Sequence, residues 1–404
     1  MDNNKRERSM LAAIFLFWFS VYTYPSFLSS YAEHTLKAGS VMVGLIVGSY
    51  GFTQMVIRIP LGIFSDIIKK RKLFVQLGFV ASMIASVGLS VVSMFDAAPH
   101  PALAVFALIC RGMAGVAAST WVAFSVLYSA AYPPEQTGAA MSRMAFPQTG
   151  SQVIAMLLGA YLMNYLGEIW AFLLATAAGV AGLVIISRVD DIPPPPGRNY
   201  TLRGLLDVAK DKGLITGTLL ATLYQLVAWA TVQGFVQNWA GEHVAGFTAT
   251  HLGWLSFAYL LPNTFISRIS GGKLSDKFGR MIVMCAGFCM VALACCLYPV
   301  TRSVALLFIN QAIFGLGTGM ILPLTMAQSI QNIPSEKKGA AMGMYQAIYG
   351  AGMFLGPVIA GAMIKWFTSA ESTVPGYTAN FVMCAVIAVL GAGIALLSGR
   401  KRIR

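Results

Sequence analysis

The chain is a series of long apolar runs separated by short breaks of charged residues, proline and glycine. A membrane-spanning helix needs about 20 mainly apolar residues. Twelve runs meet this requirement, six in each half. In the first half they cover residues 10–30, 39–64, 73–94, 101–131, 138–163 and 168–187, and in the second 213–237, 249–270, 281–300, 303–329, 338–366 and 378–398. The pattern predicts an all-α membrane protein with twelve transmembrane helices.

Residues 188–212 separate the two sets of runs. This segment contains the four prolines 193–196, which cannot be helical and favour a stiff extended backbone. We therefore predict an N-terminal six-helix bundle at 1–187, a linker at 188–212 and a C-terminal six-helix bundle at 213–404.

Composition agrees with a membrane location. The chain is 57% hydrophobic and 11% charged, whereas soluble domains carry about 25% charged residues. The basic start of the chain suggests a signal peptide, but the apolar run from Met10 is too long and no small-residue cleavage site ends it. We interpret this run as the first membrane helix.

The net charge of +13 is concentrated in alternate loops. This is the positive-inside pattern, which places those loops and both termini in the cytoplasm and excludes a nucleic-acid partner. We expect a multi-pass protein of the plasma membrane, the cytoplasmic or inner membrane of a bacterium. The six cysteines lie in apolar runs without a neighbouring histidine or acid, so no metal site is predicted.

Two short sequence words occur once in each half. The first comprises Arg58, Gly62, Ser65 and Asp66, and recurs as Arg268, Gly272, Ser275 and Asp276. The second comprises Pro133, Glu135 and Gly138 to Met141, and recurs as Pro334, Glu336 and Gly339 to Met342. Both recur about half a chain length later and in the same order, which indicates two homologous halves.

This organisation resembles the major facilitator superfamily over essentially the whole chain. The family carries a Gly-x-x-x-Asp-x-x-Gly-Arg signature after helix 2, echoed after helix 8. The echo is complete here, with Gly272, Asp276, Gly279 and Arg280, whereas the first copy lacks the Gly-Arg ending. Arg111 and Gly115 match the helix-4 signature Arg-x-x-x-Gly. The resemblance implies two pseudo-symmetric six-helix bundles, transport by alternating access, no cofactor and a monomer.

The same resemblance implies a gate at the cytoplasmic side. In the superfamily, the helix-2 Asp faces the start of helix 11 and the helix-8 Asp faces the start of helix 5, where helix N-termini are positive. Asp66 and Asp276 would then pin the halves together when the carrier opens outward. The alternative is that each Asp caps its own loop, but the repetition of both words favours the gate. The gate residues are Arg58, Gly62, Asp66, Glu135, Gly138, Arg143, Arg268, Gly272, Asp276, Arg280, Glu336 and Gly339.

Arg111 is the candidate for solute recognition. An arginine at the bilayer centre costs about 2.5–3.5 kcal/mol, so it should face protein or water. No Asp or Glu falls in the middle of a predicted helix to pair with it. Two interpretations stay open: Arg111 bonds carbonyls and tyrosines as a structural residue, or it faces the cavity and attracts an anionic or zwitterionic solute.

Polar residues of the cavity-lining helices complete the predicted site. Gln225, Trp229, Gln233 and Gln237 follow a spacing of four and share a helix face. In the superfamily, helices 1, 4, 7 and 10 line the cavity, and here helices 5 and 11 add polar residues. About half of the set is expected to contact solute, because the rest should form interhelical bonds. The set is Tyr22, Tyr24, Arg111, Gln148, Tyr224, Gln225, Trp229, Gln233, Asn310, Gln311, Tyr345 and Tyr349.

Three functional readings follow. The first is a secondary carrier, not an enzyme, for a small anionic or zwitterionic metabolite. The second is a proton-coupled drug or metabolite efflux antiporter, which is disfavoured because the antiporters' glycine-rich helix-5 motif is absent from residues 146–159. The third is a transport-dead receptor on the same fold, which predicts a large additional soluble domain that this chain lacks. Protons remain candidate partners, carried by the solute or by an outer group such as His251.

Overall fold

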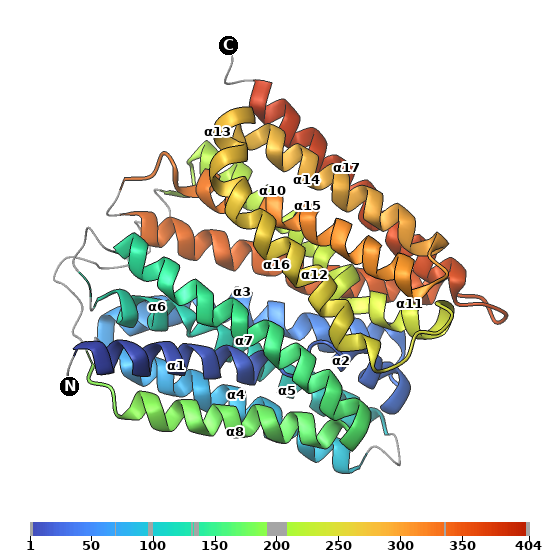
Figure 1. The fold of residues 1–404 in the computed structure, drawn as a ribbon, viewed down its shortest axis with the longest axis horizontal. Helices are drawn as coiled ribbons and strands as arrows, with labels where there is room; N and C mark the ends of the chain where they lie inside the picture. Colours follow the sequence, from blue (N-terminus) through green and yellow to red (C-terminus); the bar gives the residue numbers. More distant parts are fainter. Residues whose placement is uncertain are drawn as a thin grey trace.

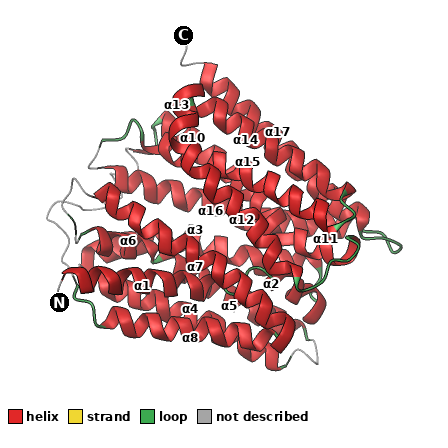
Figure 2. Cartoon of the chain, viewed as in Figure 1, coloured by secondary structure: helices red, strands yellow, loops and turns green. Residues whose placement is uncertain are grey.

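The computed structural model describes residues 3–68, 70–95, 100–130, 132, 137–191, 208–334 and 337–400, without the side chains of residues 66, 137–140, 142 and 400. These residues are helical nearly throughout (Figure 2), and their only β structure is a bridge between Ala245 and Ser303. Most of the predicted linker, together with Glu135 and Glu336 of the predicted gate, lies outside the described residues.

The described residues of the first half form six helical segments. Their elements are α1 (Asn3–Tyr22) with α2 (Leu28–Ser30) and the π-helical turn η1 (Tyr31–Thr35), α3 (Ser40–Ile68), α4 (Arg71–Met94), α5 (Pro101–Ser119) with α6 (Trp121–Ser129), α7 (Thr137–Leu166) and α8 (Glu168–Ser187).

The second half repeats this organisation. Its elements are α10 (Lys212–Ala230) with η3 (Thr231–Phe235) and α11 (Val236–His243), α12 (His251–Ile269) with η4 (Ser270–Leu274) and α13 (Ser275–Phe278), α14 (Arg280–Leu297) with η5 (Tyr298–Val300), α15 (Val304–Ile330), α16 (Lys338–Phe367) and α17 (Val374–Arg400).

Within the described residues, nine helical segments are long and apolar enough to cross a membrane. They are Ser40–Ser65, Arg71–Met94, Pro101–Ser129, Glu168–Ser187, Lys212–His243, Arg280–Val300, Val304–Ile330, Lys338–Phe367 and Val374–Gly399. The other three predicted runs are also helical, as α1, α7 and α12, so the all-helical membrane fold is confirmed. Twelve crossings remain a prediction.

The first helix differs from the uninterrupted run predicted at 10–30. It ends at Tyr22, and helical structure resumes at Leu28 and continues to Thr35. Pro25 lies in the break and explains it, because proline lacks a backbone N–H and disfavours a helical residue before it. The helical structure therefore extends beyond the predicted end and includes Glu33.

The two halves meet along one end of the molecule. We call the side where α1 begins and α17 ends the termini side, and the other the opposite side. Helices α3 and α16 pack extensively, as do α7 and α12, and each pair joins the two halves. Figure 1 shows that the two groups of helices diverge toward the termini side.

Glycines allow the backbones of α3 and α16 to approach each other closely. A Cβ atom at Gly44 would lie 2.2 Å from the carbonyl oxygen of Pro357, and one at Gly51 would lie 2.5 Å from Cβ of Met353. On α16, a Cβ at Gly361 would lie 2.2 Å from the carbonyl oxygen of Ser40. Small residues allow such approach between membrane helices. All three contacts lie toward the opposite side, where α3 begins and α16 ends.

Candidate functional site

Arg111 lies on α5, where close helix packing holds it inside the first half. A Cβ at Gly115, one turn further along, would lie 2.3 Å from the carbonyl oxygen of Tyr50 on α3, so glycine is needed there. The Thr53 hydroxyl of α3 donates a hydrogen bond to the carbonyl of Gly112 at 2.8 Å. The helix-4 signature therefore brings α5 against α3 and places Arg111 beside Tyr50.

The surroundings of Arg111 are aromatic rather than acidic. Its side chain is 3% exposed, and its guanidinium carbon lies 4.5 Å from the ring centroid of Tyr50 and 5.4 Å from that of Tyr24. Nε and Nη1 have no hydrogen-bond partner, and no described carboxylate forms an ion pair with this residue. Cation–π contacts offset part of the cost of burying the charge. Two donors of this buried cation are therefore left without a protein acceptor.

Arg58 of α3 is a second buried cation in this region. It is 4% exposed, and its Nη1 donates to Oε1 of Gln54 at 2.9 Å. The charges of Arg58 and Arg111 both act on the Tyr50 phenol. The first half therefore concentrates positive charge around one tyrosine. Arg268, the repeat equivalent of Arg58, is exposed instead, so the two halves have diverged at this position.

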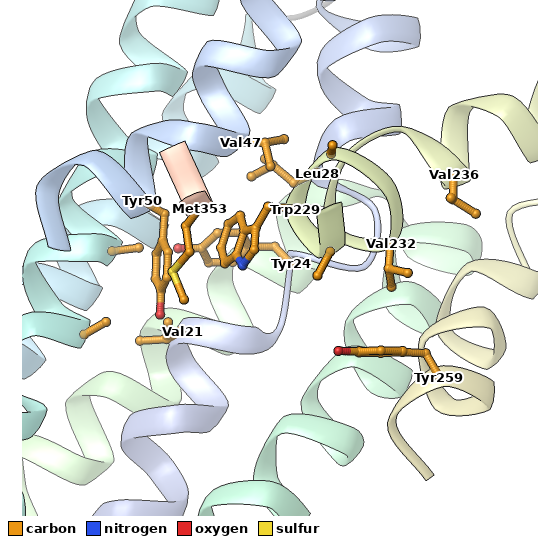
Figure 3. Packing of buried hydrophobic residues seen from close by; sticks show 14 of the residues in the cluster. Val21, Tyr24, Leu28, Val47, Tyr50, Trp229, Val232, Val236, Tyr259 and Met353 are labelled. Carbon is orange, nitrogen blue, oxygen red and sulfur yellow. The ribbon is translucent and has the colours of Figure 1, made fainter. Parts of the chain in front are cut away.

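An aromatic stack joins the halves beside Arg111. The rings of Tyr50 on α3 and Trp229 on α10 lie 5.3 Å apart between centroids, with planes inclined by 15°. Figure 3 shows this pair, with Tyr24 and the Met353 side chain of α16 beside it. Trp229 is 6% exposed and Tyr50 is 2% exposed. This packing forms a buried contact between the two halves beside Arg111.

Further tyrosines extend from this stack. The Tyr22 phenol interacts electrostatically with Arg111 of the first half and with Tyr259 and Tyr349 of the second. The Tyr224 phenol interacts in the same way with Tyr259 and Tyr345. Tyr22 and Tyr24 come from the first half and the others from the second. The structure thus gathers five of the predicted tyrosines, and adds Tyr50 and Tyr259, which were not in the predicted set.

Several other predicted solute-binding residues make hydrogen bonds within the second half. Asn310 donates to the carbonyl of Ala294 at 3.0 Å, and Gln311 accepts from the Tyr298 hydroxyl at 2.6 Å. The Tyr345 hydroxyl lies 2.9 Å from that of Thr325. Gln225 is buried on α10, whereas Gln233 and Gln148 are half-buried on η3 and α7. Asn310 and Gln311 are thus placed as packing residues in this conformation.

Three of the predicted gate residues lie near the termini side of the second half and at the start of α16. Asp276 of α13 is exposed, Gly272 lies in η4, and Gly339 lies at the start of α16. Gly279 adopts a φ of 84° between α13 and α14, a conformation that favours glycine and explains its place in the signature. In the first copy, the motif position of Gly279 is taken by Lys69, which lies outside the described residues, and the next residue, Lys70, precedes α4 with a φ of −116°.

Two gate arginines are engaged inside their own halves. Arg143 of α7 forms an ion pair with Glu7 of α1, with a distance of 3.0 Å from Nη1 to Oε1. Arg280 of α14 donates to Gln331 at 3.1 Å. Neither contact joins the halves. A hydrogen bond from Tyr132 and the neighbouring Arg143 guanidinium hold the pKa of Glu7 below its ordinary value, although partial burial opposes them.

A polar cluster that the sequence analysis missed joins the halves at the opposite side. The Ser29 hydroxyl lies 2.7 Å from Oδ1 of Asn238 and 2.9 Å from Oε1 of Gln237. Asn238 also donates to the Glu33 carboxylate. Glu33 and Glu242 lie beyond the apolar runs at 10–30 and 213–237, and the sequence analysis assigned them no role. His251 is fixed by its own turn, since its Nδ1 accepts from the backbone N–H of Thr248 at 3.1 Å.

The helical membrane fold, the two halves and the buried cation among aromatic rings define a membrane carrier. The family model of the Major Facilitator Superfamily matches residues 10–249 and 218–402. The chain belongs to this superfamily, as its signatures indicated.

Comparison with individual proteins supports the same family. The quinolone resistance protein NorA of Staphylococcus aureus is 31% identical over 120 residues, which is 30% of this chain and 31% of NorA. The multidrug transporter protein MdtP of Bacillus subtilis is 29% identical over 158 residues, which is 38% of this chain and 28% of MdtP. The matches thus span about a third of each relative.

Solved transporter structures share the fold. A mutant of the nucleoside transporter NupG superimposes with a TM-score of 0.79 at 14% identity, covering 97% of this chain and 99% of NupG. A bacterial homologue of the lysosomal transporter Spinster, in an inward-facing and unoccupied conformation, gives a TM-score of 0.78 at 14% identity, covering 98% of this chain and 97% of that protein. These structures show the fold, and membership of the superfamily makes the protein a multi-pass membrane transporter.

Proposed function

We propose that this protein carries a small anionic or zwitterionic organic solute, and that Arg111 binds its negative group. The observation that carries the proposal is the buried guanidinium with two unpartnered nitrogens and no described acid beside it. A buried charge without a counter-ion is costly, and an anionic solute supplies that counter-ion. Arginine donors in a fixed fork suit a carboxylate or phosphate group.

Aromatic side chains suit the remainder of such a solute. Tyr22, Tyr24, Tyr50 and Trp229 offer ring faces and hydroxyl groups close to Arg111. Small-molecule sites are commonly apolar and aromatic with a few placed polar groups. The solute in this proposal therefore has one negative group and a flat or apolar part.

The packing at the opposite side supports a mechanism of alternating access. In this proposal the termini side is cytoplasmic, and the structure corresponds to a state open toward it. The stacked rings of Tyr50 and Trp229 and the glycine contacts of α3 with α16 close the other side. Separating these contacts while Asp66 and Asp276 engage the starts of α16 and α7 would complete the cycle.

Proton-coupled efflux of drugs is the second candidate. Similarity to the quinolone resistance protein NorA and to the multidrug transporter MdtP favours it. The carboxylate of Glu33, which lies at the contact between the halves, supplies a titratable group that the sequence analysis did not assign. This candidate predicts cationic or neutral amphipathic solutes rather than anions.

The test is transport by purified protein in liposomes. Anionic, zwitterionic, cationic and neutral solutes of similar size are offered with and without a pH gradient, with the membrane potential clamped. We expect saturable flux of anionic or zwitterionic solutes, abolished by Arg111→Gln. Saturable flux confined to cations, driven by the gradient and retained in Arg111→Gln, would establish the efflux candidate instead.

A further inference from the structure

Two carboxylates converge on one hydroxyl group at the opposite side. Tyr377 of α17 lies 2.9 Å from Oε1 of Glu242 on α11 and 3.4 Å from Oε2 of Glu33 on η1. The carboxylate oxygens of Glu33 and Glu242 approach within 4.8 Å. Glu33 belongs to the first half, and the other two residues belong to the second. The cluster therefore spans the contact that must separate if this side is to open.

The hydrogen-bond donors around the cluster are shared unequally between the two carboxylates. The Thr373 hydroxyl donates to Oε2 of Glu242 at 2.7 Å and can itself accept from Nε2 of His243 at 2.8 Å. A tyrosine has one hydroxyl proton, and the shorter contact directs it to Glu242. Glu242 then accepts two hydrogen bonds. Glu33 is left with the Asn238 amide and faces a lone pair of the Tyr377 oxygen.

One added proton completes this arrangement. If Glu33 is protonated, its Oε2 donates to the Tyr377 oxygen, and Tyr377 donates to Glu242. An unbroken chain then runs from the first half to the second. If Glu33 is ionised, two negative groups within 4.8 Å share one donor, and like charges at this separation repel.

We propose that Glu33 is a proton-controlled latch: the protonated carboxyl holds the two halves together at the opposite side through Tyr377 and Glu242, and loss of the proton favours opening there. The latch concerns the opening step only. It applies whichever solute is carried, so it does not depend on the role of Arg111.

Other charged groups near the latch influence the charges on Glu33 and Glu242. His34 on η1 acts electrostatically on Glu33 and stabilises its ionised form when charged. His243 lies 3.4 Å from Glu242 and forms an ion pair with it when protonated. Arg302 also acts electrostatically on His243. Lys365 lines the same cavity as Glu33.

Glu33 can exchange a proton with water. It lines a cavity of about 470 Å³ between the start of α3, the end of α16 and the start of α17. Tyr377, Thr373 and Thr368 line the same cavity. A cavity of this size accommodates water where several polar groups line it, as Glu33, Thr368, Thr373 and Tyr377 do here. The proton would therefore be exchanged with the opposite side of the membrane.

The test is a distance measured across the opposite side as a function of pH. Spin labels are attached to cysteines introduced at Lys37 and Ala370, two exposed positions on different halves, after the native cysteines are replaced. Purified protein in lipid nanodiscs is measured between pH 5 and pH 9 without solute. We expect the longer-distance population to grow at least threefold as the pH rises.

Three variants separate the latch from general destabilisation. Glu33→Gln mimics the protonated group, so we expect the short distance at every pH. Glu33→Ala removes the bonds, so we expect the long distance at every pH. Glu371→Gln changes an exposed carboxyl of the same side and should titrate like the parent. A parent distance that does not change with pH, or a Glu33→Gln variant that titrates like the parent, overturns the proposal.

Discussion

Tyr50 and Trp229 come from different halves of the chain, yet their rings are stacked with centroids 5.3 Å apart. The Arg111 guanidinium lies against the same Tyr50 ring, at 4.5 Å. The ring therefore belongs both to the proposed solute site and to the closure of the opposite side. A solute that moved Tyr50 would act directly on the contact between the halves.

Removing the stack should favour opening. Aromatic pairs contribute about 0.5–1.5 kcal/mol beyond the burial of their area, so Trp229→Ala should raise the open population about 2- to 13-fold. Trp229→Phe keeps a ring and should have a smaller effect. The distance between labels at positions 37 and 370 measures this. An unchanged distance in Trp229→Ala would mean that the stack does not hold the halves together.

Glycine contacts provide an independent way to prevent closure. A Cβ at Gly44 would lie 2.2 Å from the Pro357 carbonyl oxygen, which is backbone and cannot rotate away. We expect Gly44→Ala to exclude the closed packing of α3 and α16 and to lengthen the same label distance. Gly150→Ala on α7 is the control, since nothing lies within 4 Å of its added Cβ. Equal behaviour of the two variants would contradict the assignment.

The ion pair of Glu7 with Arg143 predicts a pH dependence of stability. The folded pKa of Glu7 is lowered by Tyr132 and Arg143, so the carboxylate stabilises the fold at pH values above its unfolded pKa of about 4.3. That contribution is lost as the pH falls through the lower, folded pKa. Glu7→Gln should melt below the parent at pH 7, and the difference should shrink on acidification. Thermal melting in detergent at several pH values measures this, with Glu371→Gln as the control. A difference that is constant with pH would argue against the pair.

The gate carboxylates should stabilise the opposite state of the transport cycle, in which the termini side is closed. In the proposed outward-open state, Asp276 engages the start of α7 and Asp66 the start of α16. Asp276→Asn and Asp66→Asn should therefore increase the population of the conformation described here, which in this account is open toward the termini side. Faster thiol labelling of a Gly339→Cys probe at the start of α16 would report the shift. Unchanged labelling in both variants would refute the gate assignment.

The sequence was sufficient to predict the helices but not their ends. Apolar runs identify membrane helices because lipid excludes polar groups. That signal disappears at a helix end whose polar side chains form hydrogen bonds with polar groups of another helix. Glu33 and Glu242 lie in such places, since Asn238, Tyr377 and Thr373 bond them. Helical structure therefore continues past both predicted ends.

Part of the site could have been found by a pattern already applied elsewhere. Tyr50, Gln54 and Arg58 follow the same spacing of four that singled out the glutamines of the predicted helix at 213–237. The hydrogen bond of Arg58 to Gln54 shows that these side chains share a face. Stacking of Tyr50 on Trp229 could not be predicted from spacing, because it depends on how the two halves pack.

Arg111 provides the most direct test of the central claim. Solute flux in liposomes is compared for the parent, Arg111→Lys and Arg111→Gln at equal amounts of folded protein. The account predicts that Arg111→Lys keeps partial flux of the anionic or zwitterionic solute, because the charge survives without the arginine fork, while Arg111→Gln loses at least tenfold more. Equal loss in both variants, together with reduced protein yield, would show that Arg111 is structural.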